Sequence, residues 1–250
     1  MTNFSYTKAL FDNKPATIGL VVLQTDETLE HDFQRLIPAS NIAQHVTRIA
    51  NSSEVSCDTL AEMERLIPAA AGLFPRAARY DGIGYGCTSA TSVIGATRIA
   101  ELIGSACKTK NVTDPVSALI AACKSLNLNN IAFLSPYVEE VSGRLRGVLK
   151  DAGINTPVFG SFNEADDAKV VTIDRQSIID AAVELGQSEQ VEAVFLSCTN
   201  LKTLDVIADI EAVIGKPVLS SNQVLAWHLC RLAGVELKHE KMGRLLAGEG

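Results

Sequence analysis

Short apolar runs alternate with longer amphipathic stretches along the whole chain. This alternation is typical of repeated strand–helix units that build parallel sheets. The apolar runs predict strands at residues 17–23, 46–50, 82–86, 130–134, 157–160, 191–197 and 217–219. The order of these elements predicts an α/β fold in which helices flank parallel sheets.

A polar segment at residues 108–113 interrupts this rhythm near the middle of the chain. Asp114 and Pro115 follow it and have the residue types of a helix N-cap and first turn. We therefore place a boundary between two lobes of similar length close to residue 115, with residues 115–220 as the second lobe. The helix expected after residue 220 can pack back on the first lobe, which would then comprise residues 1–114 and 221–250.

The composition is that of a folded protein, because 47% of the 250 residues are hydrophobic. The net charge is −7 and there is no basic run, so nucleic acid is not an expected partner. No run of 18 uncharged apolar residues and no secretion signal is found, which predicts a cytosolic chain without a membrane segment. The sequence leaves open whether the chain forms a homo-oligomer.

The six cysteines are interpreted as free thiols, since a chain without an export signal meets a reducing compartment. No CxxC pair is present and the four histidines are scattered, so no metal site is predicted. Cys107 and Cys123 fall on apolar helix faces and are interpreted as core residues. Cys57 and Cys230 lack a distinctive context, and a structural role is favoured for both.

Two cysteines share a local pattern. The segments at residues 83–91 and 194–202 both predict a strand, then Cys-Thr, then a helix. Ligands of parallel sheets gather at the carboxyl ends of strands, and a helix N-terminus lowers the pKa of a thiol. Cys87 and Cys198 are therefore candidates for a nucleophile or base, although cysteine is more often an ordinary buried residue.

Two thiols on facing lobes would reach one substrate from opposite sides. One thiolate and one thiol could then exchange a proton with a substrate carbon, as a racemase or isomerase without a cofactor requires. The hydroxyl and amide groups beside the two cysteines are the predicted ligands of a substrate carboxylate; they belong to Thr88, Ser89, Thr199 and Asn200.

Four motifs, spread over most of the chain, resemble a known superfamily. They are GLVVLQTDETLE at residues 19–30, YGCTS at 85–89, LSPYVEE at 134–140 and LSCTNLKTLD at 196–205. The chain resembles the aspartate/glutamate racemase superfamily, and within it the branch of maleate cis–trans isomerases, arylmalonate decarboxylases and ectoine-utilisation proteins. The resemblance implies two pseudo-symmetric flavodoxin-like lobes, an active site between them and no cofactor.

The resemblance also implies roles for individual residues. In maleate isomerases the first cysteine adds to the double bond and the second supplies a proton, which assigns these roles to Cys87 and Cys198. A tyrosine that binds a substrate carboxylate matches Tyr137, for which an ordinary interfacial position is the alternative. The decarboxylases keep only the second cysteine, so the presence of both argues against decarboxylation.

The sequence departs from the maleate isomerases at two asparagines, which align with Asp26 and Asp167. A carboxylate about 4 Å from a substrate carboxylate would cost on the order of 4 kcal/mol at an effective dielectric of about 20. Amino-acid racemases of the superfamily carry an aspartate in this first loop, near the substrate ammonium. We therefore expect a small carboxylate with an amine or amide N–H, while helix N-capping is the alternative role for Asp26.

Other function classes fit the sequence less well. The glycine-rich strand at residues 82–86 lacks the spacing of a dinucleotide fingerprint, and neither a phosphate-binding loop nor a Gly-x-Ser-x-Gly motif is present. Three alternatives to the racemase or isomerase stay open: a true maleate isomerase, an arylmalonate-type decarboxylase, and a two-lobed protein that binds an acidic metabolite without catalysis.

Overall fold

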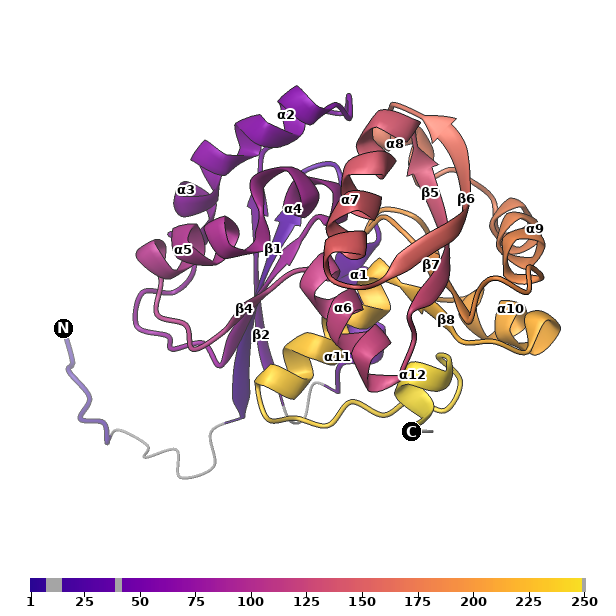
Figure 1. Cartoon of the computed structure of the whole chain (residues 1–250). Coiled ribbons are helices and arrows are strands. Elements are labelled where there is room, and N and C mark those ends of the chain that lie inside the picture. Colours follow the sequence, from indigo (N-terminus) through magenta and orange to yellow (C-terminus); the bar gives the residue numbers. More distant parts are fainter. Residues whose placement is uncertain (8–14, 39–41, 249–250) are drawn as a thin grey trace.

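The computed structural model describes residues 1–7, 15–38 and 42–248, and it contains two parallel sheets of four strands each (Figure 1). The strands of the first sheet are β1 (Ala16–Leu23), β2 (Ile42–Ile49), β3 (Gly82–Gly86) and β4 (Val112–Thr113). Those of the second sheet are β5 (Asn130–Tyr137), β6 (Asn155–Glu164), β7 (Ala193–Leu196) and β8 (Val218–Ser220).

The two sheets have equivalent topologies. Their strand orders are β2-β1-β3-β4 and β6-β5-β7-β8, so each half repeats the flavodoxin-like order 2-1-3-4. The seven predicted strands are confirmed, although their ends differ by several residues. The prediction missed β4, because this strand has only two residues and lies within the polar segment at 108–113.

Helices cover both sheets. In the first half they are α1 (Leu29–Leu36), α2 (Cys57–Glu62), the 3₁₀ helix η1 (Met63–Leu66), α3 (Ile67–Ala71), α4 (Thr88–Ile94) and α5 (Ala96–Ala106). Those that follow are α6 (Pro115–Ser125), α7 (Glu139–Asp151), α8 (Asp167–Val170), α9 (Arg175–Gly186), α10 (Ile207–Ile214), α11 (Ser221–Leu232) and α12 (Arg244–Ala247). The predicted cap of α6 is confirmed, since the Asp114 side chain accepts hydrogen bonds from the amides of Val116 and Ser117.

The end of the chain contacts both halves. After β8, helix α11 crosses back and places Leu225 and Leu229 against β3 of the first sheet. Helix α12 begins beside α10 in the second half, where the backbone amide of Arg244 donates to the Glu211 carboxylate. Because α11 and α12 contact different halves, the C-terminal segment links the two sheets.

Close packing explains the glycine-rich strand β3. A Cβ atom on Gly86 would lie 2.3 Å from Leu29 Cδ2 and 3.0 Å from the carbonyl oxygen of Val21. A Cβ on Gly82 would lie 2.8 Å from Leu229 Cδ1. The glycines therefore let α1 and α11 approach the strand, which gives the run a packing role without a nucleotide.

The four remaining cysteines have different environments. Cys123 and Cys230 are buried, as expected for core residues. Cys107 is half-buried and packs against the edge of the core, at the point where α5 ends and the chain becomes extended. Cys57 is half-buried at the start of α2. Within the described ranges, no helix is long and apolar enough to cross a membrane.

Replacing Gly86 with alanine tests the packing of β3. We expect Gly86→Ala to lower the free energy of unfolding by about 1–3 kcal/mol, because the new methyl group overpacks the contact with α1. Gly104→Ala in α5 is the matched control, since a Cβ there meets no atom within 4 Å and should stabilise the helix by up to about 1 kcal/mol. Urea unfolding measures both values, and equal stability of the two variants would contradict this packing.

Candidate active site

The candidate residues lie at the carboxyl ends of the parallel strands, at equivalent places in the two halves. Residues 25–26, Asn51 and Cys87 follow β1, β2 and β3. In the second half the corresponding positions, at the ends of β5, β6, β7 and β8, hold Tyr137, Asp167, Cys198 and Ser221. Because the halves meet at these ends, side chains from both contribute to one buried cluster.

Cys87 caps helix α4 and is buried. Its Sγ accepts a hydrogen bond of 3.3 Å from the backbone amide of Ala90. The helix N-terminus was predicted to lower the pKa of this thiol, but the pKa is raised overall. Burial raises the pKa of Cys87 to about 12, the Ala90 amide offsets only part of this rise, and the negative charges of Asp167 and Asp26 raise the pKa further.

Cys198 lies in a loop, so the helix predicted to follow it directly is absent. The next helix, α10, begins only at Ile207, and Cys198 has a φ of +114°, which L-residues rarely adopt and which costs on the order of 1–3 kcal/mol. Its backbone amide donates to Ser221 Oγ at 3.0 Å, and its Sγ accepts from the amide of Asn200 at 3.3 Å. Burial, followed by the charge of Asp167, raises the pKa of Cys198 well above its ordinary value.

Asp167 is the centre of the hydrogen-bond network. Its Oδ1 accepts from the Tyr137 hydroxyl at 2.6 Å, and its Oδ2 accepts from the Thr25 hydroxyl at 2.6 Å. The side-chain amide of Asn200 donates to the same Oδ2 at 3.3 Å. The Tyr137 oxygen also lies 3.1 Å from Cys198 Sγ. The aspartate therefore connects the loop after β1 with the second cysteine.

Asp26 uses its two oxygens differently. Its Oδ1 accepts from the amides of Thr28 and Leu29 at 2.9 and 2.8 Å, which caps α1 as the alternative interpretation expects. Its Oδ2 is buried and has no hydrogen-bond partner among the described residues. The Thr199 hydroxyl lies near Asp26 and lowers the pKa of its carboxyl. Its hydrogen bond, however, is donated to the Gly86 carbonyl. Burial is the largest influence and raises the pKa of Asp26.

The predicted carboxylate ligands mostly join the two halves. The Thr88 hydroxyl donates to Ser221 Oγ at 2.9 Å, and the Thr199 hydroxyl donates to the Gly86 carbonyl at 3.3 Å. Asn200 Oδ1 accepts from the backbone amide of Glu27 at 2.9 Å. Of the four, Ser89 alone lines the internal cavity. A role for these groups in binding a substrate carboxylate stays a prediction.

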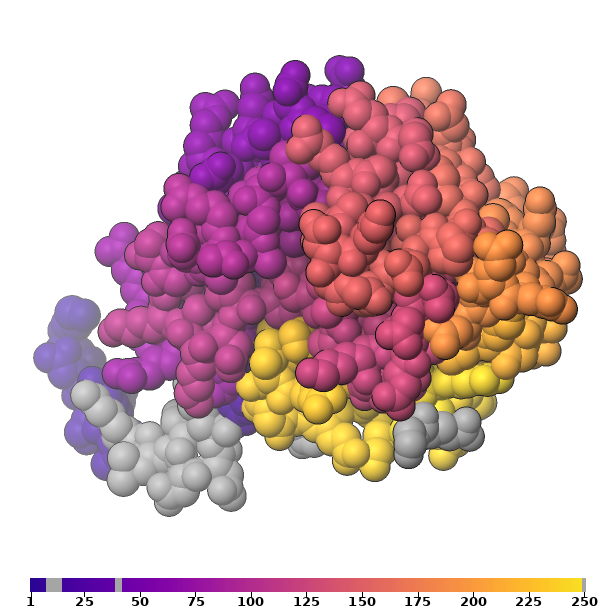
Figure 2. Space-filling model, viewed as in Figure 1, coloured from indigo at the N-terminus to yellow at the C-terminus, as the bar shows by residue number. Residues whose placement is uncertain are grey.

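The site is closed. Its cavity has a volume of about 20 Å³, room for about one water molecule, and is lined by residues that include Cys87, Ser89, Tyr137 and Asp167. On the face shown in Figure 2 the two halves meet without an open gap. A backbone clasp closes the wall, since Val55 N donates to Ala165 O and Asp167 N to Ser53 O, both at 2.9 Å. Part of this wall must move before a substrate can enter.

Residues 90–246 match the arylmalonate decarboxylase family. The chain belongs to this family. A maleate isomerase from Nocardia farcinica is 26% identical over 243 residues, which cover 92% of this chain and 94% of that protein. The arylmalonate decarboxylase of Bordetella bronchiseptica is 26% identical over 119 residues, 47% of this chain and 50% of that protein. The chain is thus similar to enzymes of both activities.

Solved structures of the family have the same fold. A maleate isomerase from Pseudomonas putida S16 with maleate superposes with a TM-score of 0.84 at 20% identity, covering 94% of this chain and 99% of that chain. A cysteine-to-serine variant of the N. farcinica maleate isomerase, with a covalently bound succinylcysteine intermediate, has a TM-score of 0.82 at 25% identity and covers 95% of this chain and 100% of that chain. These likenesses place the chain in the maleate isomerase and arylmalonate decarboxylase branch of the racemase-like proteins.

Several residues of this family member were missed by sequence reasoning. Thr25 is adjacent to Asp26 but has no distinguishing pattern. Ser221 and Asn222 follow the last predicted strand, and both are fully buried. Asn222 Nδ2 donates to Asp32 Oδ2 at 2.8 Å and to the Thr199 carbonyl at 2.9 Å, which supports the second cysteine loop. These polar residues come directly after the strand predicted at residues 217–219, and this position at a strand end could have identified them as site residues.

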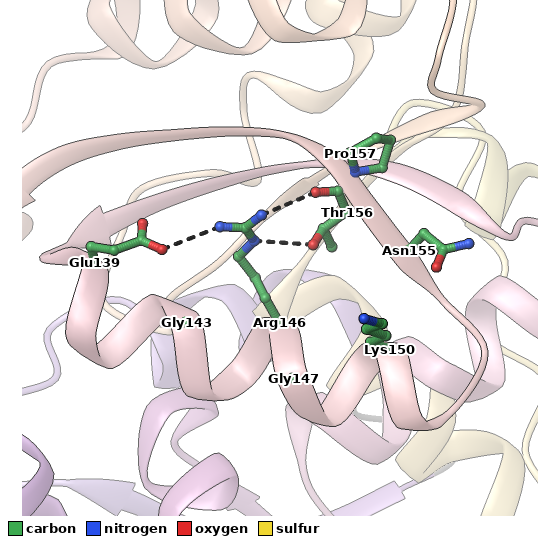
Figure 3. Close-up of a pocket in the computed structure, with 8 residues that line it drawn as sticks. All are labelled: Glu139, Gly143, Arg146, Gly147, Lys150, Asn155, Thr156 and Pro157. Carbon is green, nitrogen blue, oxygen red and sulfur yellow. Dashed lines mark hydrogen bonds and ion pairs between the residues drawn. The ribbon is translucent and has the colours of Figure 1, made fainter.

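A second concave region lies away from the cysteines. It is a surface groove of about 420 Å³ between α7 and β6, where Arg146 bonds to Glu139 and Thr156 (Figure 3). The groove contains none of the predicted site residues. In the part of the chain that the structure describes, no group of three or more histidine, cysteine or acidic side chains is arranged to hold a metal ion.

The pH dependence of stability tests the burial of Asp32. Burial raises the pKa of this carboxyl from 3.8 to about 6. The folded state therefore binds this proton more tightly than the unfolded state, and the free energy of unfolding falls as the pH rises from about 4 to about 6. Asp32→Asn removes this titration, so relative to wild type the variant should gain about 1–3 kcal/mol between pH 4 and pH 7. Urea unfolding over this range measures the gain; parallel curves for the two proteins would contradict the assignment.

Proposed function

We propose that the protein is a cofactor-independent racemase or cis–trans isomerase that acts on a small carboxylic acid through Cys87 and Cys198. One observation carries this proposal: the two cysteines follow equivalent strands of the two halves, and the charges of the same two buried carboxylates, Asp26 and Asp167, raise the pKa of both thiols. The covalent succinylcysteine in the N. farcinica relative supports cysteine chemistry at such a site.

The chemistry needs one thiolate and one thiol. In a racemisation, the thiolate takes the proton from the carbon next to the substrate carboxylate, and the thiol gives its proton to the opposite face of the same carbon. In a double-bond isomerisation, the thiolate forms a C–S bond and the thiol protonates the neighbouring carbon. The former carbon–carbon double bond is now single, so rotation about it can follow. The C–H and C–S bonds then break, which re-forms the double bond and returns the proton and the thiolate.

The surroundings of the two thiols favour their protonated form. Burial is the largest cause for each, and the charges of Asp26 and Asp167 add to it. A substrate that carries a positive charge or N–H donors would offset these negative charges and favour a thiolate. The second cysteine motif alone would suffice for the decarboxylases, so retention of both cysteines supports isomerisation or racemisation over decarboxylation.

The substrate class follows from the same two acids. Asp26 Oδ2 is buried without a hydrogen bond and could accept one from an amine or amide of the ligand. Maleate has two carboxylates and no N–H donor, and a carboxylate about 4 Å from a buried aspartate would lose about a thousandfold in affinity. We therefore propose a small carboxylate bearing an amine or amide N–H.

Proton exchange in heavy water tests the catalytic pair. Wild-type protein is incubated with amino acids, acetylated diamino acids, hydantoins and maleate, and deuterium at the substrate carbon is measured by NMR. We expect exchange with at least one N–H-bearing acid, and a loss of about a thousandfold or more in Cys87→Ser and in Cys198→Ser. Cys123→Ser, which alters a core cysteine of α6, is the matched control.

Three outcomes would contradict this proposal. Full exchange in both serine variants would remove the cysteines from the reaction. Ligand that protects the thiols from alkylation but shows no exchange would indicate a binding protein. Turnover of maleate faster than of any N–H-bearing acid would contradict the proposed substrate class and favour a maleate isomerase.

Asp26→Asn tests the substrate class separately. Asparagine caps a helix about as well as aspartate, so the cap of α1 should survive and the melting temperature should change little. We expect KM for the N–H-bearing substrate to rise by about tenfold or more, because the negative charge beside it is lost, and binding of maleate to improve. Unchanged KM values for both substrates would leave Asp26 as a cap only.

A further inference from the structure

The Tyr137 hydroxyl has one proton and two close neighbours. Asp167 Oδ1 lies 2.6 Å from its oxygen and Cys198 Sγ lies 3.1 Å away, and all three residues are buried. A carboxylate can only accept a hydrogen bond, whereas a thiol can either donate or accept. The phenol proton therefore points to Asp167, and the phenol oxygen is left to accept the proton of Cys198.

The Asp167 carboxylate is held in place for this task. The Thr25 hydroxyl and the Asn200 amide donate to its other oxygen at 2.6 and 3.3 Å. A length of 2.6 Å is typical of a hydrogen bond from a hydroxyl to a charged carboxylate, which is stronger than one to a neutral acceptor. Asp167 thus competes successfully with the sulfur for the Tyr137 proton.

The first cysteine has a different environment. Cys87 Sγ accepts a hydrogen bond from the backbone amide of Ala90, a donor that favours a thiolate. Cys198 Sγ also accepts one amide bond, from Asn200, but it has the Tyr137 oxygen as an acceptor for its own proton. The structure therefore distinguishes the two thiols, although their positions after the strands are equivalent.

We propose that Asp167 is a positioning residue that orients the Tyr137 hydroxyl away from Cys198 and so holds Cys198 as the proton-donating thiol. This role rests on the proposed function, in which Cys198 gives its proton to the substrate carbon while Cys87 acts as base or nucleophile. The S–H bond of Cys198 breaks as the new C–H bond forms, and the return step restores the proton to the sulfur.

Asp167→Asn removes the charge and changes the shape little. The neutral amide no longer outcompetes the sulfur, so Tyr137 can turn its proton to Cys198 and stabilise the thiolate. The other negative charge near both thiols, Asp26, is unchanged. Loss of the Asp167 charge alone would favour both thiolates, whereas release of Tyr137 favours that of Cys198 only.

The test measures alkylation by iodoacetamide and needs no substrate. Initial rates at Cys87 and Cys198 are followed in the same sample by mass spectrometry of their peptides, with reaction times extended until both are labelled. The proteins are wild type, D167N, Y137F, the D167N/Y137F double variant and D166N. The last removes the same charge from the half-buried neighbouring residue, whose side chain caps α8, a role that asparagine can keep. It is the matched control, and circular dichroism confirms that each variant is folded.

We expect D167N to raise the ratio of the Cys198 rate to the Cys87 rate about tenfold. Adding Y137F should abolish this rise, while Y137F in the wild-type background should not slow the alkylation of Cys198. D166N should leave the ratio unchanged. For any substrate found by proton exchange, D167N should lower kcat more than it changes KM.

Two results would overturn the proposal. An unchanged ratio in D167N would show that Asp167 does not control the second thiol. A ratio that rises equally in D167N and in the double variant would show that the charge acts directly and not through Tyr137. Because alkylation is measured without substrate, a failed search for activity would contradict the proposed function and leave this result standing.

Discussion

The negative charge of Asp167 is buried where the two halves meet, and the rest of the site depends on its hydrogen bonds. A buried carboxylate is tolerated only when polar groups replace the water that it loses. Thr25 supplies one such group from the first half, and Tyr137 and Asn200 supply two from the second. The backbone amide of Asp167 also belongs to the clasp with Ser53. The polar groups around this charge therefore come from both halves, and contact between the halves is needed to bring them together.

The same charge underlies the proposed preference for a substrate other than maleate. Together with Asp26, it places two buried acidic groups near the two thiols, and of these four groups Cys87 and Asp167 line the cavity. Two buried acids disfavour both the thiolate form of the cysteines and the binding of a dicarboxylate such as maleate. A ligand with a cationic or N–H group would offset the negative charges of the two acids. It would therefore bind favourably and also favour ionisation of a thiol. In the proposed reaction, substrate choice and activation of the cysteines are thus linked by electrostatics.

The sequence was sufficient to predict features that depend on local patterns. The strands, the cap at Asp114 and the place of Cys87 at a helix start follow from apolar runs and residue types near each other in the chain. The loop conformation of Cys198, with its positive φ, does not, because its backbone is held by Ser221 from a later strand end. The thiol pKa values were predicted in the wrong direction, since burial comes from packing of the two halves and carries no local signal.

The most direct test of the account is a crystal structure of Cys198→Ser with the substrate that the wild-type protein turns over. The account predicts that the reacting carbon lies between residues 87 and 198, within about 3.5 Å of each side chain and with the two on opposite faces. A substrate that contacts one of these residues only, or that binds in the groove between α7 and β6, would contradict it.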